Sequence, residues 1–95
     1  MKFAAIIEYT TDADKIGRVR PVHREYILGL KQRGQMAIAG PFTDDSGGLL
    51  VYEAETQEEV ENFIRQDPFF KEGVFLSWVI RGWKPVTVNT ALLPS

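Results

Sequence analysis

The sequence predicts an α+β domain in which four strands and two helices follow one another in the order βαββαβ. Three observations lead to this fold class: segments of strand periodicity alternate with two helical segments, clusters of turn residues separate them, and the length suits a single core. With 95 residues, the chain is expected to form one domain over residues 1–95, of which residues 85–95 are a C-terminal tail. The hydrophobic content of 44% and the charged content of 25% are typical of a folded domain.

The N-terminal part predicts a strand and a long helix. Lys2–Tyr9 is rich in apolar and β-branched residues, which is typical of a strand. Helical spacing follows from about Asp14 to Lys31, and Gly34 is placed to stop the helix. Because proline is tolerated only in the first turn of a helix, we expect the regular helix to begin near Arg20 or Pro21, after an irregular or short helical lead-in.

A hairpin is predicted next. It consists of a strand over Gln35–Phe42, a turn cluster over Thr43–Gly48 and a strand over Leu49–Ala54. Alternation along the first of these strands places Met36 and Ile38 on the same face.

The last third predicts a second helix and a long strand. The helix begins at a capping box formed by Thr56 and Glu59, and it ends by Asp67 because a residue before proline avoids the helical conformation. A connector over residues 69–73 leads to a final strand over Val74–Trp83. In the tail, Val86–Val88 could form a further short strand, and residues 92–94 are expected to fray.

Both faces of the predicted four-stranded antiparallel sheet carry apolar side chains. The two helices should cover one face, and a face that met water would be polar. The first strand instead carries apolar residues on both faces: Phe3, Ala5 and Ile7 on one, and Ala4 and Ile6 on the other. We therefore expect a second copy of the chain to cover the free face in a twofold homodimer. The alternative is that the tail folds back over it.

Composition argues against several classes of protein. The net charge of −2 lacks the basic excess that phosphate neutralisation requires, so no nucleic-acid partner is expected. The chain has no cysteine and one histidine, so no metal site is expected. Gly47-Gly48 lacks the further glycines and the lysine of a phosphate loop, and no cofactor is expected. Glu8 interrupts the apolar N-terminal run before a signal-peptide core or a membrane span could form, so no membrane association is expected. The absence of cysteine fits a cytoplasmic protein.

The single histidine is directed toward the domain interior. At about 100° per residue, Ile27 and Leu30 lie within about 40° of His23 on the first helix, so the imidazole is centred on the apolar stripe. The same count directs Asp67 inward, provided that the second helix persists to its last turn.

These two polar residues could form a functional pair. A buried carboxylate needs a partner, and the helices that carry His23 and Asp67 share one face of the sheet. Asp67 would orient one ring nitrogen and leave the other free as a general base or acid toward a small-molecule ligand. Two less specific interpretations stay open: a core or rim histidine, and an aspartate that caps the turn before Pro68.

Four further residues are candidates for binding a substrate. Gly40, Pro41 and Phe42 end a strand and could bring backbone close to a ligand, and Asp44 follows in the loop. Ordinary turn chemistry and a solvated carboxylate are the alternative explanations for them.

Several short motifs resemble the YciI-like (YCII-related) family over nearly the whole chain. They are Arg20-Pro21-Val22-His23 with Tyr26, Ile27 and Leu30, then Ala39-Gly40-Pro41-Phe42 with Asp44 and Gly48, and finally Asp67-Pro68-Phe69. The resemblance implies a ferredoxin-like fold of the dimeric α+β barrel superfamily, usually assembled as a homodimer. It also implies that His23 and Asp67 match the His–Asp pair proposed as the active site of that family. The chain departs from longer members in its short loop after Phe42 and in its apolar tail.

The function expected from this resemblance is acid-base chemistry on a small molecule. Most members of the family have no assigned reaction, one relative is a dehydrochlorinase in chlorinated aromatic breakdown, and muconolactone isomerases share the wider fold. Our leading hypothesis is a cofactor-independent enzyme of lyase or isomerase type in which His23 transfers a proton and Asp67 orients it. The competing hypothesis is a non-catalytic ligand-binding or regulatory module in which the pair only fixes the helices.

Overall fold

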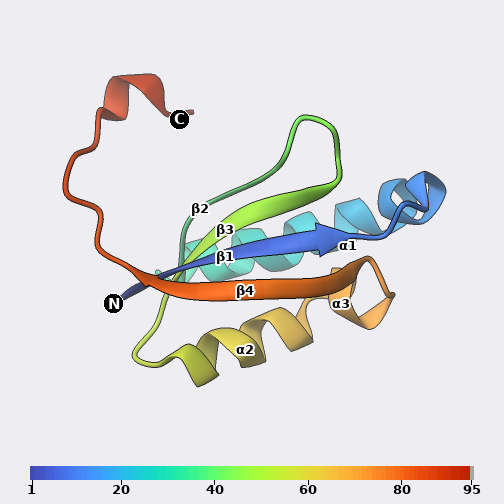
Figure 1. Cartoon of the computed structure of the whole chain (residues 1–95), viewed down its shortest axis with the longest axis horizontal. Helices are drawn as coiled ribbons and strands as arrows, with labels where there is room; N and C mark the ends of the chain where they lie inside the picture. The colour runs from blue at the N-terminus through green and yellow to red at the C-terminus, as the bar shows by residue number, and fades with distance from the viewer. Residues whose placement is uncertain (95) are drawn as a thin grey trace.

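The computed structural model describes residues 1–94 and confirms the predicted α+β fold. In chain order the elements are β1 (Lys2–Tyr9), α1 (Ala13–Gln32), β2 (Met36–Pro41), β3 (Gly47–Glu53), α2 (Gln57–Gln66), the short helix α3 (Pro68–Lys71), β4 (Phe75–Trp83) and a 3₁₀ turn (Thr90–Leu92). The four strands form one antiparallel sheet in the order β2-β3-β1-β4 (Figure 1). This is the ferredoxin-like arrangement.

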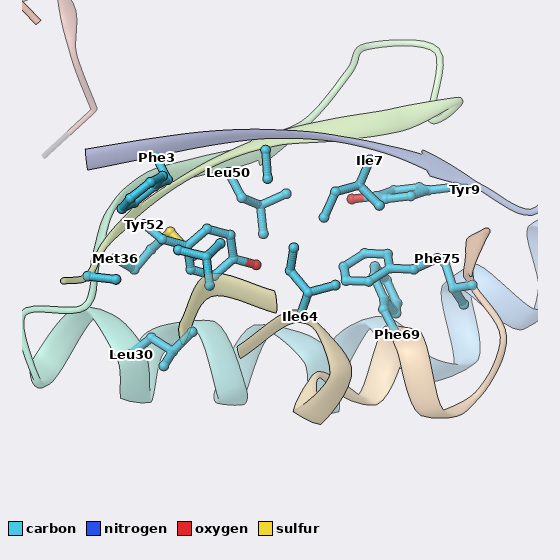
Figure 2. Close-up of a cluster of buried hydrophobic side chains, with 14 of the residues drawn as sticks. Phe3, Ile7, Tyr9, Leu30, Met36, Leu50, Tyr52, Ile64, Phe69 and Phe75 are labelled. Carbon is cyan, nitrogen blue, oxygen red and sulfur yellow. The ribbon is translucent and has the colours of Figure 1, made fainter. Parts of the chain in front are cut away.

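The core lies between the sheet and the helices, as Figure 2 shows. The inward face of β1 contributes Phe3, Ala5, Ile7 and Tyr9, and α2 contributes Val60 and Ile64, all of them buried. Helix α2 therefore packs its apolar side chains against the sheet. One layer of helices and one layer of sheet thus enclose a single core, and the opposite face of the sheet stays open.

Helix α1 runs without a break through Pro21, so the predicted irregular lead-in was wrong. The first turns are regular because Ile16 and Val19 are buried in the core, and the Asp12 side chain caps the helix by accepting a hydrogen bond from a backbone N–H. Pro21 removes the donor that would meet the carbonyl of Gly17, but both residues are exposed and water can satisfy that carbonyl. Tertiary packing therefore overrides the local preference of proline.

Only one of the two hydrogen bonds of the predicted capping box forms at the start of α2. The Thr56 hydroxyl accepts a hydrogen bond from the backbone N–H of Glu59 at 3.2 Å. The Glu59 carboxylate accepts from the N–H of Glu55 rather than from that of Thr56. The helix therefore begins where the motif predicts, but the carboxylate of Glu59 caps the residue before Thr56.

An irregularity in β2 separates two residues that simple alternation places together. Met36 pairs with Tyr52 and Ile38 pairs with Val51, so one extra residue is inserted between the two pairs. Met36 is consequently buried against the core, whereas Ile38 is 42% exposed on the open face. The prediction that Met36 and Ile38 share a face was wrong for this reason.

The C-terminal elements also differ from the prediction. Part of the expected connector forms the short helix α3, and β4 begins at Phe75. Residues 86–88 are not a strand, and the tail ends in a 3₁₀ turn. Val86 and Val88 are 87% and 67% exposed, so the tail, which leaves the end of β4 in Figure 1, buries little of its own apolar surface.

Much of the open face of the sheet is apolar, although Lys2, Glu8 and Arg81 also lie on it, and the tail leaves its middle uncovered. Ile6 and Val79 face each other across β1 and β4 and are 52% and 61% exposed. Their neighbours on this face include exposed or half-exposed apolar side chains of every strand: Ala4, Ile38, Leu49 and Trp83. A contiguous apolar surface of this kind is typical of an interface.

Gly47 provides a test of the close approach between β3 and β1. A Cβ atom at Gly47 would overlap the carbonyl oxygen of Ile7, whereas a Cβ atom at Gly17 would meet nothing within 4 Å. We expect Gly47→Ala to lower the free energy of unfolding by about 2 kcal/mol because two backbones must separate. The matched change Gly17→Ala, in a helix interior, should raise it by about 1 kcal/mol. Equal effects of the two substitutions in urea unfolding would contradict this packing.

Candidate functional site

Asp67 is a fully buried carboxylate at the junction of two helices. It ends α2 and caps α3, with an extended backbone (φ −69°, ψ 133°) that the following Pro68 favours. Its side chain is therefore directed inward by a sharp junction rather than by the helical stripe used to predict it. Oδ1 accepts hydrogen bonds from the N–H of Phe69 at 2.9 Å and from His23.

His23 is the partner of Asp67 across the helix layer. Nδ1 of His23 lies 2.7 Å from Oδ1 of Asp67, which confirms the predicted contact. An ionised carboxylate can only accept, so Nδ1 carries the proton and donates. The imidazole also stacks on Phe69, with ring centroids 3.9 Å apart and ring planes 5° apart. The ring thus has a fixed orientation.

The second ring nitrogen of His23 is available to a ligand. The His23 side chain is 11% exposed, and no protein group among residues 1–94 forms a hydrogen bond with Nε2. Only two buried side-chain atoms of these residues lack a partner, the Tyr52 hydroxyl and Asp67 Oδ2, so Nε2 is not sealed inside the core. Because Nδ1 is held by Asp67, the exposed edge of the ring is the Nε2 edge.

A small cavity lies beside His23, between α1 and the hairpin. Its volume is about 180 Å³, and its wall includes Ile27 from α1, Ala39 from β2 and Leu50 from β3. Ligand pockets for drug-sized molecules usually measure about 300 to 1,000 Å³, so this cavity suits a molecule of one ring. The site therefore combines a polar nitrogen with a mostly apolar wall.

Two of the four predicted substrate-binding residues lie at this cavity. Gly40 and Pro41 form part of its wall. Phe42 is 40% exposed and Asp44 lies in the exposed loop, and neither lines the cavity. Hydrogen bonds from Ser46 to the Asp44 carboxylate lower the pKa of Asp44, so this side chain serves the turn.

Two polar residues of the cavity wall, Tyr9 and Arg24, were not predicted as site residues from the sequence. Two features of the sequence could have found them: Arg24 follows His23 directly, and Tyr9 continues the inward alternation of β1. Tyr9 packs against Phe69 and Phe75, with centroid distances of 5.4 and 5.8 Å (Figure 2). Burial raises the pKa of Tyr9 to about 12, so its hydroxyl stays protonated at neutral pH.

No group of three or more metal-binding side chains occurs within residues 1–94. Over the same residues, no helix combines the length and the apolar character needed to cross a bilayer.

Comparison with known protein families identifies the family of the chain. The YCII-related domain matches residues 1–84, which leaves only the C-terminal tail outside the match. The chain belongs to the YCII-related domain family. No curated protein sequence matches it.

Solved structures with the same fold include enzymes. One is 5-chloro-2-hydroxyhydroquinone dehydrochlorinase (TftG) from Burkholderia phenoliruptrix AC1100, in complex with 2,5-dihydroxybenzoquinone; it is 29% identical, the match covers 88% of this chain and 94% of that chain, and the TM-score is 0.77. A muconolactone isomerase is 15% identical over 94% of this chain and 96% of its own, with a TM-score of 0.67. An antibiotic biosynthesis monooxygenase is 13% identical over 90% and 98%, with a TM-score of 0.58. The last two show the fold alone.

The buried tyrosines predict how stability depends on pH. Burial raises the pKa of both Tyr9 and Tyr26 from 10.0 to about 12. Above pH 10 the unfolded chain loses these phenolic protons while the folded chain keeps them, so the free energy of unfolding should be fully retained below pH 10 and fall between pH 10 and 12. Tyr9→Phe should make this fall shallower. Urea unfolding across the pH range measures it, and an unchanged slope in Tyr9→Phe would contradict the burial of this hydroxyl.

Proposed function

We propose that the chain is a cofactor-independent enzyme of lyase or isomerase type that moves a proton on a small cyclic molecule. The observation that carries this proposal is the 2.7 Å hydrogen bond between His23 Nδ1 and Asp67 Oδ1 at the wall of a cavity that His23 lines. An imidazole held in this way has a fixed tautomer and an unshared electron pair on Nε2 that faces the ligand.

The pair suits general base and general acid catalysis in turn. Nε2 of His23 would remove a proton from the ligand, and the resulting imidazolium would be stabilised by the buried Asp67 carboxylate. The imidazolium could then return this proton to another atom of the ligand ring, which is an isomerisation. Alternatively, the proton could remain on Nε2 while a leaving group departs from the ligand with its bonding electrons, which is an elimination. Neither path needs an external oxidant.

The relative TftG supports the elimination path. It is a dehydrochlorinase, and its match covers 94% of its own length. Loss of HCl from a chlorinated, hydroxylated ring needs a base for the proton and a route for chloride, and His23 would be that base. The muconolactone isomerase has the same fold, but at 15% identity it does not favour isomerisation over elimination.

The competing hypothesis is a non-catalytic module that binds a small ligand. In that case the pair of His23 and Asp67 only joins α1 to the junction of α2 and α3. Asp67 has no exposed surface and His23 is 9% exposed, which a structural pair would also show. Substitutions at His23 separate the two hypotheses.

We expect His23→Asn to abolish turnover without unfolding the protein. The amide of asparagine can still donate to Asp67 but offers no titratable nitrogen to the ligand, so kcat should fall by at least about 100-fold. Release of chloride from 5-chloro-2-hydroxyhydroquinone is the first reaction to measure, because TftG is named for it. Circular dichroism and thermal unfolding establish that the fold is kept.

The alanine variant completes this comparison. His23→Ala removes both the donor to Asp67 and the free nitrogen, so it should lose activity and stability together. If His23→Asn retains full turnover of any substrate that the wild type converts, the catalytic role of His23 is wrong. If only His23→Ala has an effect, the pair is structural.

We also propose that two copies pair through the open face of the sheet. Exposed apolar side chains on all four strands support this, with Ile6 and Val79 at the middle of the face. The tail leaves both of these residues more than half exposed, so a second copy is the better cover.

This pairing predicts a dimer that one charge can disrupt. Val79→Asp should weaken dimerisation by at least about tenfold because it places an unpaired carboxylate in an apolar interface. The control Val22→Asp changes a valine that is 53% exposed on α1, and it should leave the dimer intact. Sedimentation velocity at micromolar concentration measures both variants, and a monomeric wild type would overturn the proposal.

A further inference from the structure

The cavity beside His23 has a cationic side chain on its wall. Its wall includes Arg24, and none of its eight lining residues is acidic. Two carboxylates lie near this wall. That of Asp67 is behind the imidazole and is bound to His23 and to the Phe69 backbone, and that of Asp45 is paired with Arg20. A ligand in this cavity therefore meets a guanidinium and an imidazole, and no opposing carboxylate among the lining residues.

Arg24 is not neutralised by an ion pair within residues 1–94. Arg20, one helical turn earlier, differs from Arg24 in having an ion pair. Arg20 binds Asp45 of the hairpin loop at 2.9 Å, and this pair holds the loop against α1. The two arginines therefore have different roles. Arg20 stabilises the hairpin loop through its ion pair, whereas the charge of Arg24 is available at the cavity.

Tyr9 adds an uncharged donor to the same wall. A Cβ atom at Gly48 would lie 2.7 Å from the Tyr9 hydroxyl, so the absence of a side chain at Gly48 makes room for this group. No group of residues 1–94 accepts a hydrogen bond from the hydroxyl, and it is not one of the fully buried unpaired atoms. With a pKa of about 12, it is a donor at neutral pH. The ring of Tyr9 packs against Phe69 and Phe75 and leaves the hydroxyl free for a ligand.

We propose that the ligand of this cavity is a one-ring organic anion with an ionised oxygen, such as a carboxylate, phenolate or enolate, bound by the Arg24 guanidinium and the Tyr9 hydroxyl. This inference names the substrate class of the site under the proposed function and rests on that function only for the step that follows binding. An anionic substrate also suits the chemistry, because negative charge on the ring oxygen helps a leaving group to depart.

Two probes of equal shape test the charge preference. Benzoate carries an ionised carboxylate, and benzamide replaces it by a neutral amide of the same size. The chain has one histidine, so the ring proton signals of His23 in the NMR spectrum report binding at this cavity and no other. We expect benzoate to bind at least about tenfold more tightly than benzamide, which is the effect of roughly 1.4 kcal/mol.

Variants on a single helix assign the preference to Arg24. Arg24→Gln should reduce the ratio of the two affinities to within about twofold, and Arg24→Lys, which keeps the charge, should retain most of it. Arg18→Gln removes an equal charge from an exposed residue of α1 that does not line the cavity, and the ratio should not change. Tyr9→Phe keeps the ring and should weaken benzoate by about tenfold, the usual loss for a hydrogen bond to a charged group.

The possible outcomes separate this inference from the proposed enzyme. Equal binding of the two probes, no binding of benzoate at millimolar concentration, or an equal loss in Arg18→Gln and Arg24→Gln would overturn the anion site. If benzoate is preferred and no substrate is ever turned over, the anion site stands and the enzyme does not. If a neutral substrate is converted while the two probes bind equally, the enzyme stands and the anion site does not.

Discussion

The buried carboxylate of Asp67 is the group on which the rest of this structure depends. A charge without solvent needs partners, and Asp67 obtains them from two directions: a backbone N–H of the next helix and the imidazole of His23 on α1. Its second oxygen has no partner among residues 1–94, and its charge adds to the burial that raises the pKa of Tyr52. The interaction that joins the helix layer is thereby also the one that prepares His23 for chemistry.

Three consecutive residues build most of this arrangement. Pro68 favours the extended backbone that turns the Asp67 side chain inward and also begins the next short helix. Phe69 then donates its N–H to Asp67 and places its ring flat against His23. Within three residues, the chain thus holds the imidazole of His23 by a hydrogen bond to Nδ1 and by stacking against its ring face.

The sequence predicted the architecture well because the fold follows from patterns that act over short distances. Strand alternation, the capping threonine and the glycine after α1 each specify one local structure, and the helical wheel directed His23 inward. It predicted less where distant contacts decide. The continuity of α1 through Pro21 depends on the burial of Ile16 and Val19, and the inserted residue of β2 has no sequence signal. Tyr9 and Arg24 join the site only because the hairpin lies against α1.

The separation of His23 and Asp67 along the chain has a consequence for how the site arises. They are 44 positions apart: His23 lies on α1, and Asp67 lies between α2 and α3, in the other half of the βαββαβ order. Loop closure over such a distance is completed only when both helices have docked on the sheet. A chain in which either segment has not packed on the sheet therefore contains every residue of the site but has no site.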